Sequence, residues 1–404
     1  MFGWEFPPFK AGGLATATFG LVKGLLRQGV DVTLVVPFQG GADEPSGMRL
    51  VSAPEFGSRL RIRRIASALL PYPGAAQHVA DDERPGAVAP SAVYGPNLLE
   101  EVERFTDLAS DIAAVEPHDV IDVHDWITFG AGLRARDVSG RPLVAHIHAT
   151  EYDRSGDGAN PAIVERERAG LHAATRVISN SHMLARSVIE TYGVPADRVD
   201  VVHWGIDRDP GGAETQGLLD AKPIVLFLGR ITRQKGPRYF LDVARRVIDL
   251  EPDARFVVAG DGDQLPDMID RAAELGIAGR VLFTGGLEGT DVERAYRMAD
   301  VCVMTSISEP FGLVALESVR VGTPCIVPRE SGVAEVLDNA FKADFWDIDE
   351  MADTIVALTR HPALRAEIRE RGLSELAEPR LTLEEPARKT ADVYRRAILN
   401  GGIR

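Results

Sequence analysis

Two glutamates, Glu309 and Glu317, stand eight positions apart in the segment TSISEPFGLVALESVRVGTPCIV. A residue before proline disfavours the helical region, so we expect the Glu309 carboxylate to project from an extended loop after a strand. Glu317 falls in the apolar helix that should follow, where a carboxylate needs a polar partner or solvent. A ribose diol could supply hydroxyl donors to Glu317, and an ion pair with Arg320 is the structural alternative.

Two cations follow another predicted strand. In the segment LFLGRITRQKG a β-branched run ends at Gly229, and Arg230 and Lys235 come next in one loop. Arginine can bind a phosphate as a fork, and lysine can neutralise it as a mobile point charge. The pair favours a diphosphate ligand, with ordinary surface basicity as the alternative.

Two glycine-containing helix starts could bind an anion through unpaired backbone N–H groups and the helix dipole. Glycine lets a phosphate approach the backbone closely. The first start, PPFKAGGLATAT, lacks the dinucleotide fingerprint G-x-G-x-x-G. The residues concerned are Gly12, Gly13 and Leu14 in that segment, and Gly312, Leu313 and Val314 before Glu317.

Polar and aromatic groups follow two further predicted strands, in the segments VHDWITFGAG and AHIHATEYDR. Asp125 could accept hydrogen bonds from hydroxyl groups, and Trp126 could offer an aromatic face to a sugar ring. His148 ends the second strand, and we expect His146 to point to the opposite face as a satisfied buried histidine. Histidines at irregular spacing on different strands are a poor metal pattern, so we expect no metal there. They are His124, His146, His148 and His203.

Short β-branched runs alternate with helical patterns, and these elements must position the groups above. Such alternation is typical of βα units around a parallel sheet. In the first half we expect a short strand at 1–4, a helix after it, a strand at 30–36, loops with a short hairpin between 40 and 91, and a helix at 97–110. Strands should follow at 120–124, 143–148, 177–180 and 199–203.

A Gly-, Asp- and Pro-rich segment, GIDRDPGGAETQGLLDAKP, is typical of a linker and separates a second set of βα units. The strands of this set are expected at 224–228, 255–259, 281–283, 301–305 and 324–327. The fold class is therefore α/β, with two doubly wound, Rossmann-like parallel-sheet domains facing each other across a cleft. Ligands should bind at the carboxyl ends of the strands that border this cleft.

The composition is that of an acidic globular protein. Its 404 residues are enough for two or three domains, and a net charge of -15 argues against a nucleic-acid binder. No apolar run reaches the roughly 18–20 residues of a membrane span, and the N-terminus lacks the pattern of a secretory signal. Cys302 and Cys325 lie in apolar segments, which favours reduced thiols and a cytoplasmic location.

Several motifs occur in a fixed order along the chain: GWEFPPFKAGGLATATFGLVKGL, VHDW, HIHATEYDR, VVHWGID, FLGRITRQKG, VLFTGGL and SEPFGLVALESVRVGTPCIV. In these motifs and their order the chain resembles the retaining glycosyltransferases of the two-Rossmann-domain type, called GT-B, in family GT4 with its glycogen and starch synthase relatives. The resemblance covers nearly the whole chain and is strongest over 224–336, and its hallmark is the E-x7-E element.

The resemblance implies a role for each matching residue in the second half. Glu309 would contact the hydroxyls of the donor sugar, and Glu317 those of the ribose. Arg230 and Lys235 would neutralise the diphosphate, assisted by the amides of the two helix starts. The loop from Thr284 to Leu287 would meet the nucleotide base.

In the first half, the resemblance implies that His148 contacts the donor sugar near the reacting carbon, with Asp125 and Trp126 close by. The implied domains are an acceptor-side domain at 1–205, a linker at 206–221, a nucleotide-sugar domain at 222–383, and a C-terminal helix at 384–404 that crosses back to the first domain. Two features depart from the family pattern. The first strand begins within a few residues of the start of the sequence, and Trp204 stands where the family commonly has asparagine.

The implied reaction moves a hexosyl unit, glucosyl before others, from a nucleoside diphosphate to an acceptor hydroxyl with retention of the α configuration. An α-glucan acceptor would fit a synthase of the glycogen type. The alternatives are a mannosyl or other hexosyl transferase for a polysaccharide or glycolipid, a sugar-nucleotide epimerase, a phosphorylase with a pyridoxal cofactor, and a non-enzymatic nucleotide-sugar sensor. Fixed cations and amides would replace a metal, so no metal or other cofactor is expected. The nucleotide base, the acceptor and the oligomeric state stay open.

Overall fold

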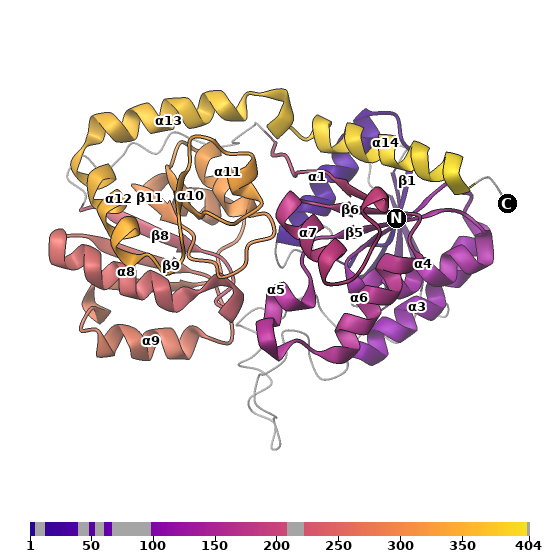
Figure 1. Cartoon of the computed structure of the whole chain (residues 1–404), viewed down its shortest axis with the longest axis horizontal. Helices are drawn as coiled ribbons and strands as arrows, with labels where there is room; N and C mark the ends of the chain where they lie inside the picture. The colour runs from indigo at the N-terminus through magenta and orange to yellow at the C-terminus, as the bar shows by residue number, and fades with distance from the viewer. Residues whose placement is uncertain (5–12, 39–47, 53–59, 67–97, 208–221, 402–404) are drawn as a thin grey trace, which may run out of the picture. The chain divides into compact units, whose positions relative to one another are not determined.

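The computed structural model describes residues 1–4, 13–38, 48–52, 60–66, 98–207 and 222–401. The chain divides into two compact units (Figure 1). The first unit comprises the described residues of Met1–Pro73, Ala92–Gly205 and Leu383–Arg404, and the second those of Ile206–Thr382. Each unit is a parallel-sheet α/β domain, as the sequence predicts.

The strands of the first unit form one sheet that is joined through a single residue near the N-terminus. Phe2 makes parallel bridges to Val35 on one side and to Val123 on the other. The expected first strand is thus reduced to a bridge, and the expected hairpin is confirmed as the antiparallel pair β2 and β3. The strands lie in the order β2-β3-β1, then Phe2, then β4-β5-β6-β7. Their bounds are β1 Val32–Phe38, β2 Met48–Ser52, β3 Leu60–Ala66, β4 Ile121–His124, β5 Leu143–Ile147, β6 Arg176–Ser179 and β7 Val199–Val201.

The helices of the first unit include one from the far end of the sequence. The bounds are α1 Gly13–Arg27, α3 Leu98–Val115, α4 Trp126–Ser139, α5 Glu151–Ser155, α6 Pro161–Ala173, α7 His182–Glu190 and α14 Glu384–Gly401. Figure 1 shows α14, in yellow, beside α1. The two helices pack closely because α1 carries glycine at the contact: a Cβ atom on Gly24 would lie 2.6 Å from the Cβ of Ala387.

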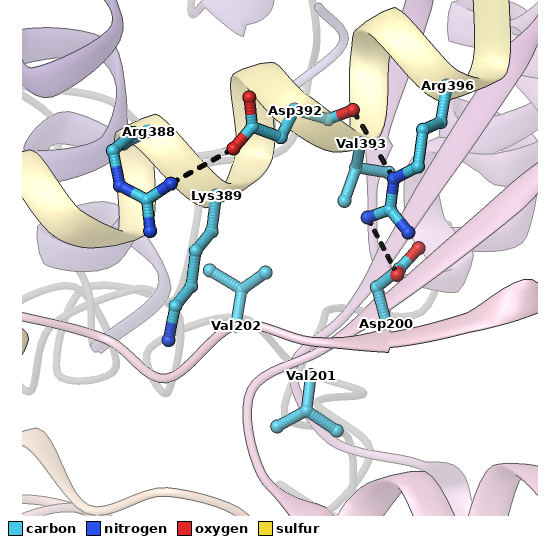
Figure 2. Close-up of a pocket in the computed structure, with 8 residues that line it drawn as sticks. All are labelled: Asp200, Val201, Val202, Arg388, Lys389, Asp392, Val393 and Arg396. Atoms are coloured by element: carbon cyan, nitrogen blue, oxygen red, sulfur yellow. Dashed lines mark hydrogen bonds and ion pairs between the residues drawn. The ribbon is translucent and has the colours of Figure 1, made fainter.

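A small pocket lies between β7 and α14, and its charged side chains pair with one another (Figure 2). Arg396 Nη2 lies 2.9 Å from Asp200 Oδ1, and Arg388 Nη1 lies 3.0 Å from Asp392 Oδ2. Asp200 also pairs with Arg176, at 2.6 Å. Of these ion pairs, the one between Arg396 and Asp200 joins α14 to the edge of the sheet.

The second unit has a single sheet in which every pair of neighbouring strands is parallel. Its strand order is β10-β9-β8-β11-β12-β13, so the order of the chain reverses between β8 and β11. In open α/β sheets, such a switch point is where ligands bind, at the carboxyl ends of the strands. The bounds are β8 Ile224–Leu228, β9 Arg255–Ala259, β10 Val281–Gly285, β11 Val301–Val303, β12 Cys325–Pro328 and β13 Phe341–Ala343.

The helices of the second unit bury apolar stripes against this sheet. In α8, for example, Phe240, Leu241, Ala244 and Val247 are all fully buried. The bounds are α8 Pro237–Leu250, α9 Leu265–Glu274, α10 Thr290–Met298, α11 Leu313–Arg320, α12 Ile348–Arg360 and α13 Pro362–Leu376. β13 was not predicted, because it has only three residues and lacks a β-branched run.

Candidate active site

The predicted cation and carboxylate meet at the switch point of the second unit. Lys235 Nζ lies 2.7 Å from Glu309 Oε2, and Ser306 Oγ donates to the same oxygen at 2.8 Å. Glu309 is almost fully buried, whereas Lys235 is partly exposed. Among the described residues no hydrogen bond reaches the other oxygen, Oε1, which is therefore available to a ligand hydroxyl.

The loops that carry Lys235 and Glu309 are held together by hydrogen bonds to backbone carbonyls. Thr305 Oγ1 donates to the Gly236 carbonyl at 3.0 Å, and the Ile307 N–H donates to the Gln234 carbonyl at 2.9 Å. Gly236 has φ 58°, and a Cβ atom there would lie 2.1 Å from the Thr305 carbonyl oxygen. Only glycine fits this crossing, because any side chain would push the two loops apart.

Arg230 also follows β8, in the loop that packs on the end of β9. The Ile231 N–H donates to the Asp261 carbonyl at 2.8 Å, and a Cβ atom on Gly260 would lie 1.9 Å from the Gly229 oxygen. Arg230 is partly buried. The loop bearing the predicted diphosphate cations is thus fixed against both neighbouring strands.

The expected base-binding loop lies at the end of β10, beyond β9. The Gly286 N–H donates to Asp261 Oδ2 at 2.7 Å, which fixes this loop to the one after β9. Thr284 is exposed and Leu287 is partly buried. Neighbouring strands are about 4.8 Å apart, so the loop lies about two strand spacings, roughly 10 Å, from the loop of Lys235.

Helix α11 begins where the sequence predicts. Gly312 precedes it with φ 108°, a backbone conformation that favours glycine. Leu313 and Val314, in its first turn, are partly buried. Glu317 is also partly buried, and its Oε2 accepts a hydrogen bond of 3.0 Å from the hydroxyl of Tyr296. The carboxylate therefore has a polar partner from α10 in addition to any ligand.

In the first unit, His148 follows β5 in a rigid setting. Its N–H donates to Asp125 Oδ1 at 2.7 Å, and its carbonyl accepts a hydrogen bond of 3.0 Å from Asn180 Nδ2. The indole of Trp204 stacks on its imidazole, with 5.2 Å between the ring centroids and 13° between the planes. The residue that departs from the family pattern, Trp204, thus packs directly on a predicted catalytic side chain.

Asp125 holds the backbone of His148 at a cost in local strain. Its φ of 61° lies in the left-handed region, which non-glycine residues rarely adopt. Burial raises the pKa of Asp125 to about 6, against the opposing effect of the Arg154 charge. Because its Oδ1 already accepts the His148 N–H, the observed role of Asp125 is to position that loop.

Two expectations for this region were wrong. Trp126 is 2% exposed and belongs to the apolar core, so its ring has no face for a sugar; α4 begins at Trp126 and turns the side chain inward. His146 does not point away from His148, because residues two apart on a strand share a face. The rings of His124, His146 and His148 lie nearly parallel in one cluster, with centroid distances of 4.5 Å and 5.2 Å from His124 and 6.2 Å between His146 and His148.

The three rings lie beside the buried carboxylate of Asp122, which was not predicted as a site residue. Asp122 is 3% exposed and lies 3.4 Å from His124 Nε2 and 3.1 Å from His146 Nε2. The atoms of Asp122, His124 and His146 that could bind a metal ion lie within 4.8 Å of one another. Burial lowers the pKa of His148 well below its usual range, and its histidine neighbours lower it further, so its imidazole is neutral at neutral pH. The D-x-H spacing on one strand was the available signal, since it puts both side chains on one face.

The remaining predicted residues lie at the start of α1. Gly13 opens this helix and is exposed, and Leu14 is partly buried. Gly12 lies outside the described residues.

Comparison with known proteins agrees with this architecture. Residues 11–210 match the model of glycosyltransferase family 4, and residues 214–374 match that of glycosyl transferases group 1. A D-inositol 3-phosphate glycosyltransferase of Catenulispora acidiphila is 32% identical over 306 residues, which are 70% of this chain and 71% of that protein. The chain therefore belongs to glycosyltransferase family 4. An uncharacterized glycosyltransferase of Methanocaldococcus jannaschii is 28% identical over 369 residues, 88% of this chain and 86% of that one.

Solved structures show the same fold. Sucrose-phosphate synthase from Thermosynechococcus elongatus superposes with a TM-score of 0.74 at 19% identity, covering 99% of this chain and 100% of that one. The catalytic domain of starch synthase IV from Arabidopsis thaliana, bound to ADP and acarbose, gives 0.71 at 18% identity, covering 98% of each chain. An Anabaena protein in complex with UDP-glucose gives 0.67 at 18% identity, covering 98% of this chain and 100% of that one. The fold of this glycosyltransferase is thus GT-B. Among its described residues, no helix combines the length and apolar character of a membrane span.

Proposed function

We propose that this glycosyltransferase moves a hexosyl unit, glucosyl before others, from a nucleoside diphosphate to an acceptor hydroxyl with retention of configuration. The observation that carries the proposal is the contact of Lys235 with Glu309 at the point where the strand order of the second unit reverses. A cation and a buried carboxylate side by side suit a ligand that carries a diphosphate next to a polyhydroxyl ring.

The donor would lie along the carboxyl edge of the second sheet. The loop from Thr284 to Leu287 would meet the base. Glu317 would accept hydrogen bonds from the ribose hydroxyls, while the Tyr296 hydroxyl donates to its Oε2. Arg230, Lys235 and the amides at the start of α11 would face the diphosphate. Glu309 Oε1 would accept a hydrogen bond from a hydroxyl of the sugar.

Retention needs no enzyme nucleophile if the acceptor attacks from the face that the diphosphate leaves. The leaving phosphate oxygen then takes the proton of the acceptor hydroxyl, while the sugar passes through an oxocarbenium-like state. The task of the protein is to stabilise the departing negative charge with groups already in place. Because Arg230, Lys235 and the amides supply the positive charge that stabilises it, we propose turnover without a divalent metal, and activity should persist in EDTA.

Two kinds of acceptor have support. The glycogen-type motifs favour an α-glucan, whereas the similarity to D-inositol 3-phosphate glycosyltransferases favours a phosphorylated polyol. We propose both as the first acceptors to test, each with UDP-, ADP- and GDP-linked glucose and mannose. Anomeric analysis of the first product by NMR tests retention, and release of nucleotide without an acceptor would favour an epimerase or hydrolase.

The decisive variant is Lys235→Ala. Loss of one group that stabilises developing charge typically costs about 2.7–4 kcal/mol, so kcat should fall roughly 10²–10³-fold with the fold intact. Lys222→Ala is the matched control, because Lys222 is exposed at the opposite end of the same strand and pairs with Asp253 at 2.9 Å. Turnover of Lys235→Ala at the level of Lys222→Ala would contradict the assignment.

A further inference from the structure

A row of buried polar groups connects helix α14 with His148. The hydroxyl of Tyr394 donates to Asp122 Oδ2, and His124 Nε2 lies 3.4 Å from the same oxygen. On the other side of its ring, His124 Nδ1 lies 2.9 Å from His148 Nε2. Asp122 and His124 are 3% and 0% exposed, so bulk solvent does not reach this part of the row.

The contact between the two rings restricts where their protons can lie. Two imidazole nitrogens at 2.9 Å form a hydrogen bond only when one of them carries a proton and the other accepts it. Either His124 donates from Nδ1, or His148 donates from Nε2. The charge next to the other nitrogen of His124 decides between these arrangements.

Asp122 supplies that charge. Its pKa is held well below the usual range, since the attraction of His146 and His124 outweighs the effect of burial, so the carboxyl is ionised. A carboxylate near Nε2 of His124 favours the proton on that nitrogen, as it does behind a catalytic histidine elsewhere. Nδ1 of His124 is then the acceptor, and His148 must donate from Nε2.

We propose that Asp122, acting through His124, fixes His148 in the tautomer protonated on Nε2 and so leaves its Nδ1 as a hydrogen-bond acceptor. Asp122 and His124 are then positioning residues for His148. The catalytic consequence rests on the proposed function: Nδ1 would accept a hydrogen bond from a substrate hydroxyl near the reacting carbon. Among the described residues no hydrogen bond reaches this Nδ1 atom.

His146 strengthens the same arrangement. Its Nε2 lies 3.1 Å from Asp122 Oδ1, so the carboxylate stands between two imidazole edges and receives the Tyr394 hydroxyl as well. These groups keep the carboxylate ionised without placing a charge on His148 itself.

The tautomer can be measured directly in the full chain labelled with ¹⁵N-histidine, by long-range ¹H–¹⁵N correlation, with His148 assigned from a His148→Gln variant. In the wild type we expect His148 to be neutral, with the proton on Nε2. Asp122→Asn places an amide donor near His124 Nε2, which reverses the row and moves the His148 proton to Nδ1. Finding the Nδ1-protonated form in the wild type would overturn the proposal.

Activity provides the second readout. The same exchange behind the histidine of serine proteases gives the wrong tautomer and lowers kcat about 10⁴-fold with the geometry intact. We expect Asp122→Asn to lower kcat at least about tenfold, with the KM of the donor nearly unchanged. The control Asp200→Asn removes a carboxylate of the same sheet that pairs with Arg176 and Arg396, and should retain the tautomer and the kcat.

Two outcomes separate this inference from its alternatives. One equivalent of a divalent metal found by mass spectrometry in the wild type and lost from Asp122→Asn would replace the proton row with a metal site at Asp122, His124 and His146. The Nε2-protonated form in a wild type that transfers no sugar would support the row while refuting the proposed function. If Asp122→Asn does not fold, the wild-type spectrum still decides the tautomer.

Discussion

A single buried acid, Glu167, fixes the segment that follows His148. It is fully buried on α6, and its carboxylate accepts from the Tyr192 hydroxyl, from Arg154 Nη2 at 2.5 Å and from the Glu151 N–H at 3.0 Å. Arg154 in turn donates to the Ala149 carbonyl at 2.7 Å, which ties the network to the chain next to His148. Burial raises the pKa of Glu167 to about 7.

This shift makes stability depend on pH. The pKa of Glu167 rises from 4.5 in the unfolded chain to about 7 in the fold, so its protonation stabilises the fold fully below about pH 4.5, and this contribution is lost as the pH rises through about 7. Glu167→Gln should flatten that part of the pH curve, by an amount on the order of 3 kcal/mol. Urea denaturation at several pH values between these limits measures it. Glu165→Gln, exposed on the same helix, is the control, and parallel curves for both variants would refute the prediction.

At this scale the sequence predicted the residues whose role depends on local chemistry. Glu309 and Lys235 meet because each follows a strand at the switch point, which the motif spacing implied. Trp126 was misjudged because its orientation depends on where α4 begins, whereas the orientation of His146 follows from the two-residue period of a strand and could have been predicted. Trp204 could be noticed only as a departure, since its stacking partner lies 56 positions earlier in the chain.

Among the elements, the crossing of the two loops at Gly236 determines the geometry of the donor site. The carbonyl of Thr305 occupies the space of a side chain, and the φ of 58° favours glycine. Lys235, the preceding residue, therefore reaches Glu309 only because the two loops can approach this closely.

Gly236→Ala should separate these loops. We expect a loss of about 1–3 kcal/mol in the free energy of unfolding, with a further cost of about 1–2 kcal/mol for the left-handed backbone, and a higher KM for the donor. Gly279→Ala in the same unit meets nothing within 4 Å and should be neutral. Thermal unfolding and steady-state kinetics of the two variants provide the comparison, and equal behaviour would count against the crossing as a determinant.

Strands that are continuous apolar runs were predicted with the correct bounds, whereas the shortest pairings were not. The strands at Ile224–Leu228 and Arg255–Ala259 match the predicted bounds, because each is an apolar run ended by glycine. The first strand shrank to a bridge at Phe2, and β13 was missed. Short pairings of this kind depend on neighbours distant in sequence, which no local pattern records.

For the whole molecule, the main feature is that the chain leaves the first unit and returns to it. The chain leaves the first unit before Ile206 and returns to it after Thr382. These two residues form a parallel bridge, and the Ile206 N–H donates to the Leu381 carbonyl at 2.9 Å. After Thr382, α14 packs on α1, β5 and β6 of the first unit. The last helix of the sequence is therefore part of the core of the first unit.

Removing α14 should affect only that unit. In a chain ending at Thr382, hydrogen exchange should speed up in α1, β5 and β6, and remain slow in β8, β9 and β11 of the second unit. Gly24→Val is a milder variant with the same expected pattern, because its side chain would meet Ala387 and the Leu383 carbonyl. An equal rise in both units would contradict a local role for α14.

The return of the chain also has a consequence for synthesis on the ribosome. Residues 206–382 are continuous, so the second unit can fold as soon as they emerge, and domains tend to fold as units during translation. The first unit, although translated earlier, lacks the helix that covers α1 and the hydroxyl of Tyr394 until residues 384–401 have been translated. The half of the enzyme that is made first is therefore the half that is finished last.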